Sequence, residues 1–465
     1  MVAIAGFFSP LSANIYFPAL PALAQAVHVS NADINLTLTT YLIFQGLSPT
    51  IFGDLGDMVG RRPTYILGFI VYIGANIGLA LQTSYPALLI LRCLQSSGSS
   101  GTVALGSGVV ADISVSSERG TYLGWATVGF MVGPTLGPVI GGILTQFLGW
   151  RSIFWFLVIA AGAFLALFLV TFPETGRNVV GNGSVPPPRW NMSLLSYLSL
   201  RSSDLASHEA GRQAQAELAK TRERRMPNPL KALRIIIEKD VAIVLFYNAL
   251  IYTEFYTILS TTPNEFLEIY GFNNLQIGLC YLPFGIGSVI GSVVFGRVMD
   301  WNYRRIALRL NFPIDRKRGD DLSNFPIERA RIQVVWPLVG LTSATTLCYG
   351  WALERNAPLA APLILQFIFG FGGMGIFNAC SVLLVDLYPS QPATATAANN
   401  LCRCSMGAAG TAVIAQMITT MGRGWCFTFV AAVCLLFSPI LLLSTRWGPK
   451  WREERRVRLK ERAER

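Results

Sequence analysis

The chain has 465 residues, of which 52% are hydrophobic and 14% are charged, and its formal net charge is +11. A soluble protein would carry about a quarter charged residues, so the composition excludes an ordinary soluble domain. Charge-poor runs recur along the whole sequence, and many approach the ~20 residues that cross a hydrocarbon core of ~30 Å. Because that core offers no water to backbone groups, each run is predicted to be a helix.

The basic surplus also suits a nucleic-acid-binding protein, but its distribution argues against that class. Lys and Arg fall overwhelmingly into alternate loops, above all into segment 173–239, the stretch 297–331 and the tail. This positive-inside pattern predicts that both termini and segment 173–239 are cytoplasmic. We therefore expect a lipid bilayer as partner and no nucleic acid.

The apolar runs predict twelve membrane spans. Their predicted ranges are 2–25, 34–53, 64–82, 86–110, 120–145, 151–171, 241–262, 275–297, 333–353, 359–385, 397–420 and 425–444. The first span begins almost at Met1 without a basic stretch before it, which fits a signal peptide poorly. The predicted division is a six-helix bundle over 1–172, a cytoplasmic linker over 173–239, a second six-helix bundle over 240–444 and a basic cytoplasmic tail over 445–465.

Neither a metal site nor a catalytic constellation is predicted. The eight cysteines lie in or at the ends of apolar runs, as expected for small buried side chains, and His28 and His208 both lie in predicted loops. We expect no cofactor, no metal and no enzymatic activity, since both histidines lie in loops and no nucleophile–histidine or metal constellation supports them.

Span 1 carries Asn14 and Tyr16, and the turn after span 2 carries a charged motif that recurs in the second half. The turn runs from Gly53 through Asp57 and Gly60 to Arg61 and Arg62; Asp57 is expected to face a helix N-terminus or to pair with Arg61. After span 8, Gly296 is followed by Asp300 and by the pair Arg304-Arg305, with the same Gly-to-Asp spacing of four. Equivalent motifs in two halves predict a duplicated bundle with a site between the halves.

Two ionisable residues lie well inside predicted spans. Arg92 in span 4 is costly there and therefore a functional candidate, with a structural pair to Gln95 or Gln45 as the alternative. Glu254 in span 7 is the only carboxylate well inside a span, and an apolar surrounding favours its neutral form. It is predicted to carry a proton, or otherwise to make only a hydrogen bond in a water-filled vestibule.

The turn after span 2 resembles the signature loop of the major facilitator superfamily. Span 5 resembles the antiporter motif of drug:proton antiporters at every position: Gly124, Gly133, Gly137, Pro138, Gly141 and Gly142. The resemblance implies an all-α integral membrane protein with the major facilitator fold, twelve transmembrane helices in two pseudo-symmetric six-helix bundles. It also implies export by exchange for protons, and a role in proton coupling for Arg92, whose Arg-x-x-Gln context is similar to the family's span-4 motif.

Several stretches resemble the fungal drug:proton antiporters, closest to the quinidine-resistance-type multidrug exporters, with the fungal citrate exporter a near neighbour. They include residues 9–20, Pro173-Glu174-Thr175 and residues 325–331. The resemblance implies the plasma membrane and a small-molecule substrate such as a drug, toxin or secondary metabolite. Where relatives often have Asp, this chain has Asn14, which cannot take up a proton and so gives more weight to Glu254, Asp112 and Asp386. We expect a monomer.

The pocket is predicted from polar and aromatic residues midway along spans of both halves, a mixture that suits an amphiphilic molecule. These candidates are Asn14, Tyr16, Tyr41, Gln45, Tyr252, Phe255, Tyr256, Tyr281 and Asn400. Arg403 in span 11 is predicted either to attract an anionic substrate or to pair with a carboxylate. The alternatives are an exporter of organic acids resembling citrate and a non-transporting sensor that retains the fold.

Overall fold

The computed structural model describes residues 1–113, 119–181, 185–201, 230–310, 325–388 and 392–463. Within these ranges the secondary structure is helical, and no strand occurs. Residues 119–131 are described as helix only, without their side chains. Two hydrophilic stretches of the sequence, the polar run 202–225 and the basic run 315–318, lie outside the described residues.

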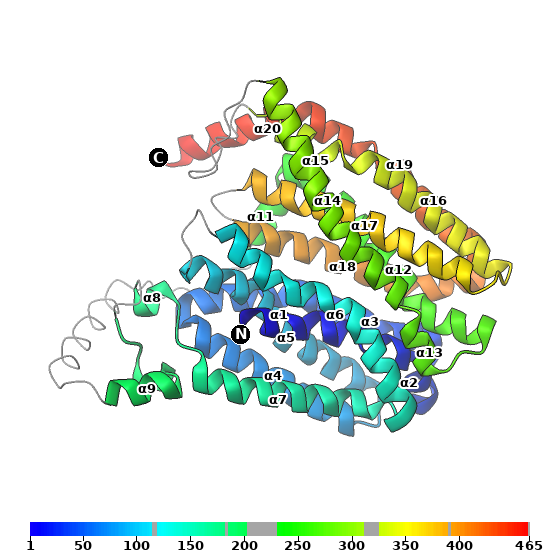
Figure 1. The fold of residues 1–465 in the computed structure, drawn as a ribbon, viewed down its shortest axis with the longest axis horizontal. Coiled ribbons are helices and arrows are strands. Elements are labelled where there is room, and N and C mark those ends of the chain that lie inside the picture. The colour runs from blue at the N-terminus through cyan, green and yellow to red at the C-terminus, as the bar shows by residue number, and fades with distance from the viewer. Residues whose placement is uncertain (114–118, 182–184, 202–229, 311–324, 389–391, 464–465) are drawn as a thin grey trace.

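Six helical rods form the first group of helices, which we call the N-half (Figure 1). The first rod is broken into three pieces, and each of the others is a single helix. The elements are α1 (Val2–Asn14), η1 (Phe17–Ala19) and α2 (Leu20–Val27), then α3 (Asn31–Val59), α4 (Arg61–Leu81), α5 (Tyr85–Ile113), α6 (Arg119–Leu148) and α7 (Arg151–Thr171).

Six further rods form the second group, the C-half. They are α12 (Lys239–Tyr270), α13 with α14 (Asn274–Leu279, Leu282–Arg309), α15 with α16 (Ile327–Ile332, Val335–Glu354), α17 (Ala360–Leu387), α18 (Pro392–Met421) and α19 with α20 (Arg423–Phe437, Ile440–Ala463). In the sequence, the short helices α8 (Arg177–Val180), η2 (Arg189–Asn191), α9 (Leu194–Arg201) and α11 (Leu230–Ile237) connect the two halves.

Prolines stand at the breaks within the rods. Pro18 lies in the 3₁₀ turn that separates α1 from α2, Pro283 follows the break between α13 and α14, and Pro439 lies between α19 and α20. Proline lacks the backbone N–H and disfavours helical geometry in the preceding residue, so these rods bend at those points.

The outer surface of this chain carries many large apolar side chains, and its interior holds charged ones, unlike a soluble protein. Large apolar side chains face outward, as at Ile159 (70% exposed) and Leu436 (75%), whereas Arg92 and Glu254 are fully buried. By length and hydropathy, nine helices among the described residues are suited to crossing a membrane. The protein is therefore a multi-pass membrane protein.

The remaining rods, α3, α5 and α6, are not among these nine helices. Helices α3 and α5 bury polar side chains inside the protein, including Gln45, Arg92 and Gln95. In α6 only Val132–Leu148 enters the comparison. Several helices also extend beyond the predicted spans, as α12 does over Lys239–Tyr270 against the predicted 241–262, because a helix can continue past the hydrocarbon layer.

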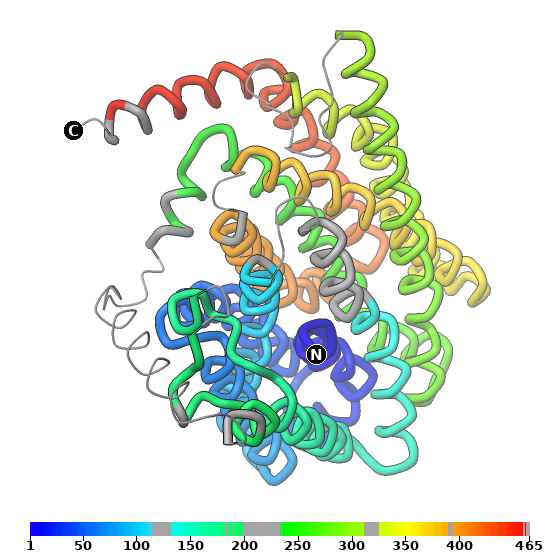
Figure 2. The backbone as a smooth tube through the Cα atoms, turned by 60° about the vertical axis from the view of Figure 1, so that its left-hand side comes forward, coloured from blue at the N-terminus to red at the C-terminus, as the bar shows by residue number. Residues whose placement is uncertain are grey.

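The two halves pack through pairs of helices that exchange under a pseudo-twofold rotation. Helix α3 of the N-half lies along α18 of the C-half, and α6 lies against α13 and α14 (Figures 1 and 2). We call the end of the bundle that holds Arg61, Arg331 and Arg455 the basic end, and the other end, with the turns at Gly149 and Gly422, the opposite end. The predicted chain division at 172, 239 and 444 remains a prediction.

Candidate functional site

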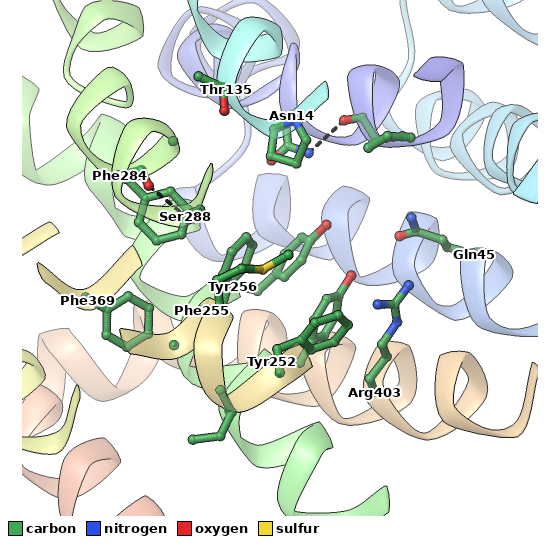
Figure 3. A pocket seen from close by; sticks show the side chains of 17 residues that line it. Asn14, Gln45, Thr135, Tyr252, Phe255, Tyr256, Phe284, Ser288, Phe369 and Arg403 are labelled. Atoms are coloured by element: carbon green, nitrogen blue, oxygen red, sulfur yellow. Dashed lines mark hydrogen bonds between the residues drawn. The ribbon is translucent and has the colours of Figure 1, made fainter. Parts of the chain in front are cut away.

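A chamber lies between the halves. Helices α1, α3 and α6 of the N-half and α12, α14, α17 and α18 of the C-half contribute to its wall, which is largely apolar and aromatic (Figure 3). Its lining residues include Asn14, Gln45, Thr135, Tyr252, Phe255, Tyr256, Phe284, Ser288, Phe369, Phe377 and Arg403. A wall shared by both halves changes whenever the halves move relative to each other.

A second chamber continues from the first toward the basic end. Gln45, Met374, Phe377 and Arg403 line both chambers. The far wall of the second chamber includes Val2 at the start of α1, Ser107 near the end of α5, Val385 near the end of α17 and Thr396 near the start of α18. The cavity therefore extends along the interface from the middle of the bundle to the basic end.

The halves meet closely at the opposite end. Phe17 is fully buried and stacks on Tyr281, with ring centroids 5.9 Å apart, and its ring also lies 6.2 Å from that of Tyr256. A Cβ atom on Gly142 would lie 3.1 Å from the Cα of Gly278. The structure thus has a conformation with a cavity toward the basic end and close contact at the opposite end.

Arg403 stands where the two chambers join. Its Nε and Nη2 donate to Oδ1 of Asn400, at 2.9 and 2.6 Å, and its guanidinium lies 5.0 Å from the centre of the Tyr252 ring and 5.2 Å from that of Phe377. Asn400 in turn donates to the carbonyl oxygen of Gln45 at 2.7 Å. These contacts fix the cation at the interface between the halves.

Arg92 lies in a different place, inside the N-half. It is fully buried between the rings of Tyr16 and Tyr41, 4.1 and 4.3 Å from their centres, and donates to Oε1 of Gln95 at 2.6 Å. Gln95 in turn donates from Nε2 to Oδ1 of Asn76 at 2.7 Å. Nε and Nη2 of Arg92 have no hydrogen-bond partner among the described residues. The two stacked rings hold a membrane-buried cation largely by cation–π attraction.

Glu254 faces away from the chamber. Neighbouring positions on α12, Tyr252, Phe255 and Tyr256, line the chamber, but Glu254 is fully buried in the C-half and accepts from Oγ1 of Thr346 on α16 at 2.7 Å. Its Oε2 has no hydrogen-bond partner among the described residues. The carboxyl group is therefore held in the C-half core, and any part it plays in coupling must act through α12 and α16.

The span-5 glycines bring α6 against two different neighbours. Within the N-half, Cβ atoms on Gly133, Gly137 and Gly141 would lie within 3.0 Å of Pro10, Asn14 and Ile15 of the α1 rod. Gly142 instead faces α13 of the C-half. Pro138 lies in α6 among these glycines, and Gly124 lies in the part of α6 without described side chains. Among the motif glycines whose surroundings are described, Gly142 is therefore the one that contacts the other half.

Arg61 joins two helix ends at the basic end of the N-half. Its Nη2 lies 2.6 Å from Oδ1 of Asp57 at the end of α3, and its Nε lies 2.9 Å from Oδ2 of Asp112 at the end of α5. Of the two expected arrangements for Asp57, the structure has the pair with Arg61. Asp112 belongs to this cluster and does not line either chamber.

Glu174, which carries the fungal resemblance in Pro173-Glu174-Thr175, accepts bonds from the first turn of α4. The backbone N–H groups of Arg61 and Arg62 donate to its two carboxylate oxygens at 2.8 and 3.2 Å, and Nδ2 of Asn191 donates at 2.7 Å. Gly60, with φ of +118°, leaves room for this carboxylate, since a Cβ there would lie 2.5 Å from its oxygen. A carboxylate at a helix N-terminus accepts from the backbone N–H groups of the first turn, and its negative charge interacts favourably with the helix dipole.

The charge cluster is repeated in the C-half. Arg331, at the start of the ninth rod, lies 3.0 Å from Asp386 at the end of α17 and 3.8 Å from Asp300 in α14. The sequence repeat showed the spacing of Gly296, Asp300 and the pair Arg304-Arg305 but did not point to Arg331. Arg331 occupies the position in the C-half that Arg61 has in the N-half. The two halves therefore repeat the charge cluster in space, although the sequence motifs alone do not align Arg331 with Arg61.

The structure gathers some of the predicted pocket residues and separates others. Asn14, Gln45, Tyr252, Phe255, Tyr256 and Arg403 line the central chamber, and Asn400 lines the second one. Tyr16 and Tyr41 enclose Arg92, and Tyr281 is buried at the opposite end. Sequence reasoning missed Thr135, Phe284, Ser288, Phe369 and Phe377. A signal was present, because Phe369, Gly373 and Phe377 recur at a spacing of four on α17 and so share one helix face.

A bundle of membrane-spanning helices with a cavity enclosed by two related halves defines a transporter class of protein. A sequence model of the Major Facilitator Superfamily matches residues 2–411. The MFS-type transporter phiD of a fungal species is 46% identical over 97% of this chain and 68% of its own length. Citrate exporter 1 of Aspergillus niger is 40% identical over 100% of this chain and 88% of its own. The chain belongs to the Major Facilitator Superfamily.

Solved structures show the same fold. The D-xylose-proton symporter superimposes with a TM-score of 0.67 over 96% of this chain and 97% of its own, at 16% sequence identity. The human organic anion transporter MFSD10 superimposes with a TM-score of 0.59 over 95% of this chain, at 18% identity. These likenesses concern the fold alone. The predicted superfamily and fold are confirmed, and this protein is a fungal-type transporter of that superfamily.

Proposed function

We propose that this protein exports small organic molecules, drugs, toxins or secondary metabolites, in exchange for protons by alternating access. The observation that carries the proposal is the cavity between the halves, which extends to the basic end while the opposite end is in close contact. If the basic end is cytoplasmic, as the distribution of Lys and Arg predicts, this conformation admits substrate from the cell. We also propose the plasma membrane as the location, with both termini cytoplasmic, and a monomer as the working form.

The proton is assigned to Glu254, with Arg92 as a second buried charge; both lie inside a helical bundle and outside the chamber. Glu254 can take up and release a proton in the C-half core, and Arg92 holds a fixed positive charge in the N-half. Asn14 lines the chamber where a carboxylate would be available to protons, and it cannot serve. Proton binding at Glu254 then changes the packing of α12 against α16, and α12 carries Tyr252, Phe255 and Tyr256 into the chamber.

The second candidate function is export of an organic acid resembling citrate. The name of the relative Citrate exporter 1 suggests it, and Arg403 in the chamber wall supports it, since a guanidinium binds carboxylates. In this function Arg92 does not contact substrate, because Tyr16, Tyr41 and Gln95 enclose it in the N-half.

The test is flux in proteoliposomes that hold the purified full-length chain under an imposed pH gradient. We expect accumulation of an organic substrate against its gradient, abolished by a protonophore. A Glu254→Gln variant should bind substrate and lose the dependence on the pH gradient. The matched control is Glu268→Gln on the same helix, whose side chain is 61% exposed. Unchanged proton dependence in Glu254→Gln would remove that residue as the carrier.

A further inference from the structure

The charge on the chamber wall restricts the substrate. Among the described residues that line either chamber, Arg403 is the only charged side chain, and no Asp or Glu is present. The central part of the chamber is otherwise built from aromatic rings, with Tyr252, Phe255, Tyr256 and Phe284 on one side. A cationic group placed there meets a like charge in a medium of low dielectric constant, without a carboxylate on the wall to offset it.

The position of Arg403 suits the binding of an anion at one defined point. Asn400 orients the guanidinium by accepting from its Nε and Nη2. Figure 3 shows that the guanidinium of Arg403 and the side-chain amide of Gln45 come from opposite halves and both extend into the space between them. Gln45 is 4% exposed and lines both chambers. A side-chain amide also has two N–H donors, so a carboxylate can bind between the amide and the guanidinium.

We propose that the substrate of this site is an amphiphilic organic acid, with its carboxylate between Arg403 and Gln45 and its apolar body against the aromatic wall of the central chamber. The use of this site for transport rests on the proposed export function, whereas binding does not. The assignment separates the protein from an exporter of cationic drugs. It also disfavours citrate, because a compact trianion would bring three carboxylates to one guanidinium and would leave the aromatic wall unfilled.

The site also links the substrate to the halves. Arg403 belongs to the C-half and Gln45 to the N-half, and the backbone of Gln45 already accepts from Asn400. An anion that binds both side chains adds a contact across the interface at the junction of the two chambers. Separation of α3 from α18 would break that contact, so the bound acid favours the arrangement of helices seen here.

The experiment compares four probes on the purified full-length protein in detergent by equilibrium dialysis: 2-naphthoate, 2-naphthamide, 2-naphthylmethylammonium and citrate. The first three share one ring system and differ in charge. A charge-assisted bond is stronger than its neutral counterpart by about tenfold or more in affinity, so 2-naphthoate should bind at least that much more tightly than the other three. Arg403→Gln should reduce binding of 2-naphthoate to the level of 2-naphthamide, whose own binding should stay unchanged. Gln45→Leu should weaken 2-naphthoate by a smaller factor.

The ranking in the wild-type protein needs no variant, so it decides the proposal even if a variant fails to fold. Tighter binding of the ammonium probe or of citrate, equal binding of all probes, or binding of none would overturn it. The outcome is separable from that of the export function. Proton exchange driven by the ammonium probe in proteoliposomes would support exchange and contradict the organic-acid assignment, whereas tight binding of 2-naphthoate without any flux would do the reverse.

Discussion

Gly142 of α6 and Gly278 of α13 lie backbone against backbone between the two halves at the opposite end. A Cβ atom on Gly142 would lie 3.1 Å from the Cα of Gly278 and 2.6 Å from the carbonyl oxygen of Asn274. A Cβ on Gly278 would in turn lie 2.6 Å from the carbonyl oxygen of Pro138. This contact closes the opposite end only because neither position carries a side chain.

A leucine at this contact should therefore prevent closure. Forcing a side chain into a packed contact costs about 1–3 kcal/mol, so we expect Gly142→Leu to lower transport by about tenfold or more while the fold persists. The measurement is substrate flux in proteoliposomes with a thermal-unfolding check. Gly162→Leu on α7 is the control, since a Cβ there has nothing within 4 Å. Wild-type flux in Gly142→Leu would show that this contact does not form in the transport cycle.

Gly137→Leu should behave differently from Gly142→Leu. Its neighbours are Asn14 and Ile15 of the same half, with the Cβ position 3.0 Å from the backbone nitrogen of Ile15. We expect loss of stability of the N-half, with the melting temperature lowered and less folded protein recovered. A Gly137→Leu protein with wild-type stability but no transport would contradict this and would make α1 and α6 a moving pair.

The two charge clusters at the basic end should contribute similarly to stability. Arg61 pairs with Asp112 at 2.9 Å, and Arg331 pairs with Asp386 at 3.0 Å. We expect Asp112→Asn and Asp386→Asn to lower the free energy of unfolding by about 1–3 kcal/mol each, because each leaves a partly buried guanidinium with one fewer anionic partner. Thermal unfolding in detergent measures both. A loss of stability in one variant alone would mean that the two clusters do not contribute equally to the free energy of unfolding.

The helix α20 should be part of the C-half fold. Arg455 lies 2.7 Å from Asp240, which is 3% exposed at its side chain, and donates to the carbonyl oxygen of Leu387 at 2.8 Å. Removing one partner of a buried pair costs about 3–5 kcal/mol, so Arg455→Ala should lower the unfolding temperature strongly. The neighbouring Arg456 is 49% exposed and lies 3.6 Å from Glu453, so Arg456→Ala should change stability by less than about 1 kcal/mol. Equal effects of the two substitutions would contradict a docked α20.

Much of the fold follows from the sequence because the membrane imposes it. Long apolar runs must be helices there, and their number and order are read directly from hydropathy. Proline lacks the backbone N–H and is compatible with the breaks near Pro18, Pro283 and Pro439, but it does not locate them, since Pro49 and Pro263 lie inside continuous helices. The ends of the helices do not follow, because α3 and α12 continue past the apolar stretch.

The site could be predicted only in part. Spacing identifies residues that share a helix, so Tyr252 and Tyr256 could be proposed for the wall, but the rotation of α12 decides that Glu254 points to α16 instead. The two rings around Arg92 come from the α1 rod and α3, and a single sequence does not show which helices pack together. For the same reason the sequence does not show that Arg331, which belongs to another rod, lies beside Asp300.

The central claim is that the cavity between the halves serves exchange of an organic molecule for protons. Its most direct test is substrate-induced proton movement in proteoliposomes, with 2-naphthoate, 2-naphthylmethylammonium and citrate as probes on the wild-type protein. The account predicts proton movement with at least one probe, lost in Gly142→Leu and kept in Gly162→Leu. Substrate flux without proton movement under any imposed gradient would contradict exchange and leave a transporter driven by the substrate gradient alone.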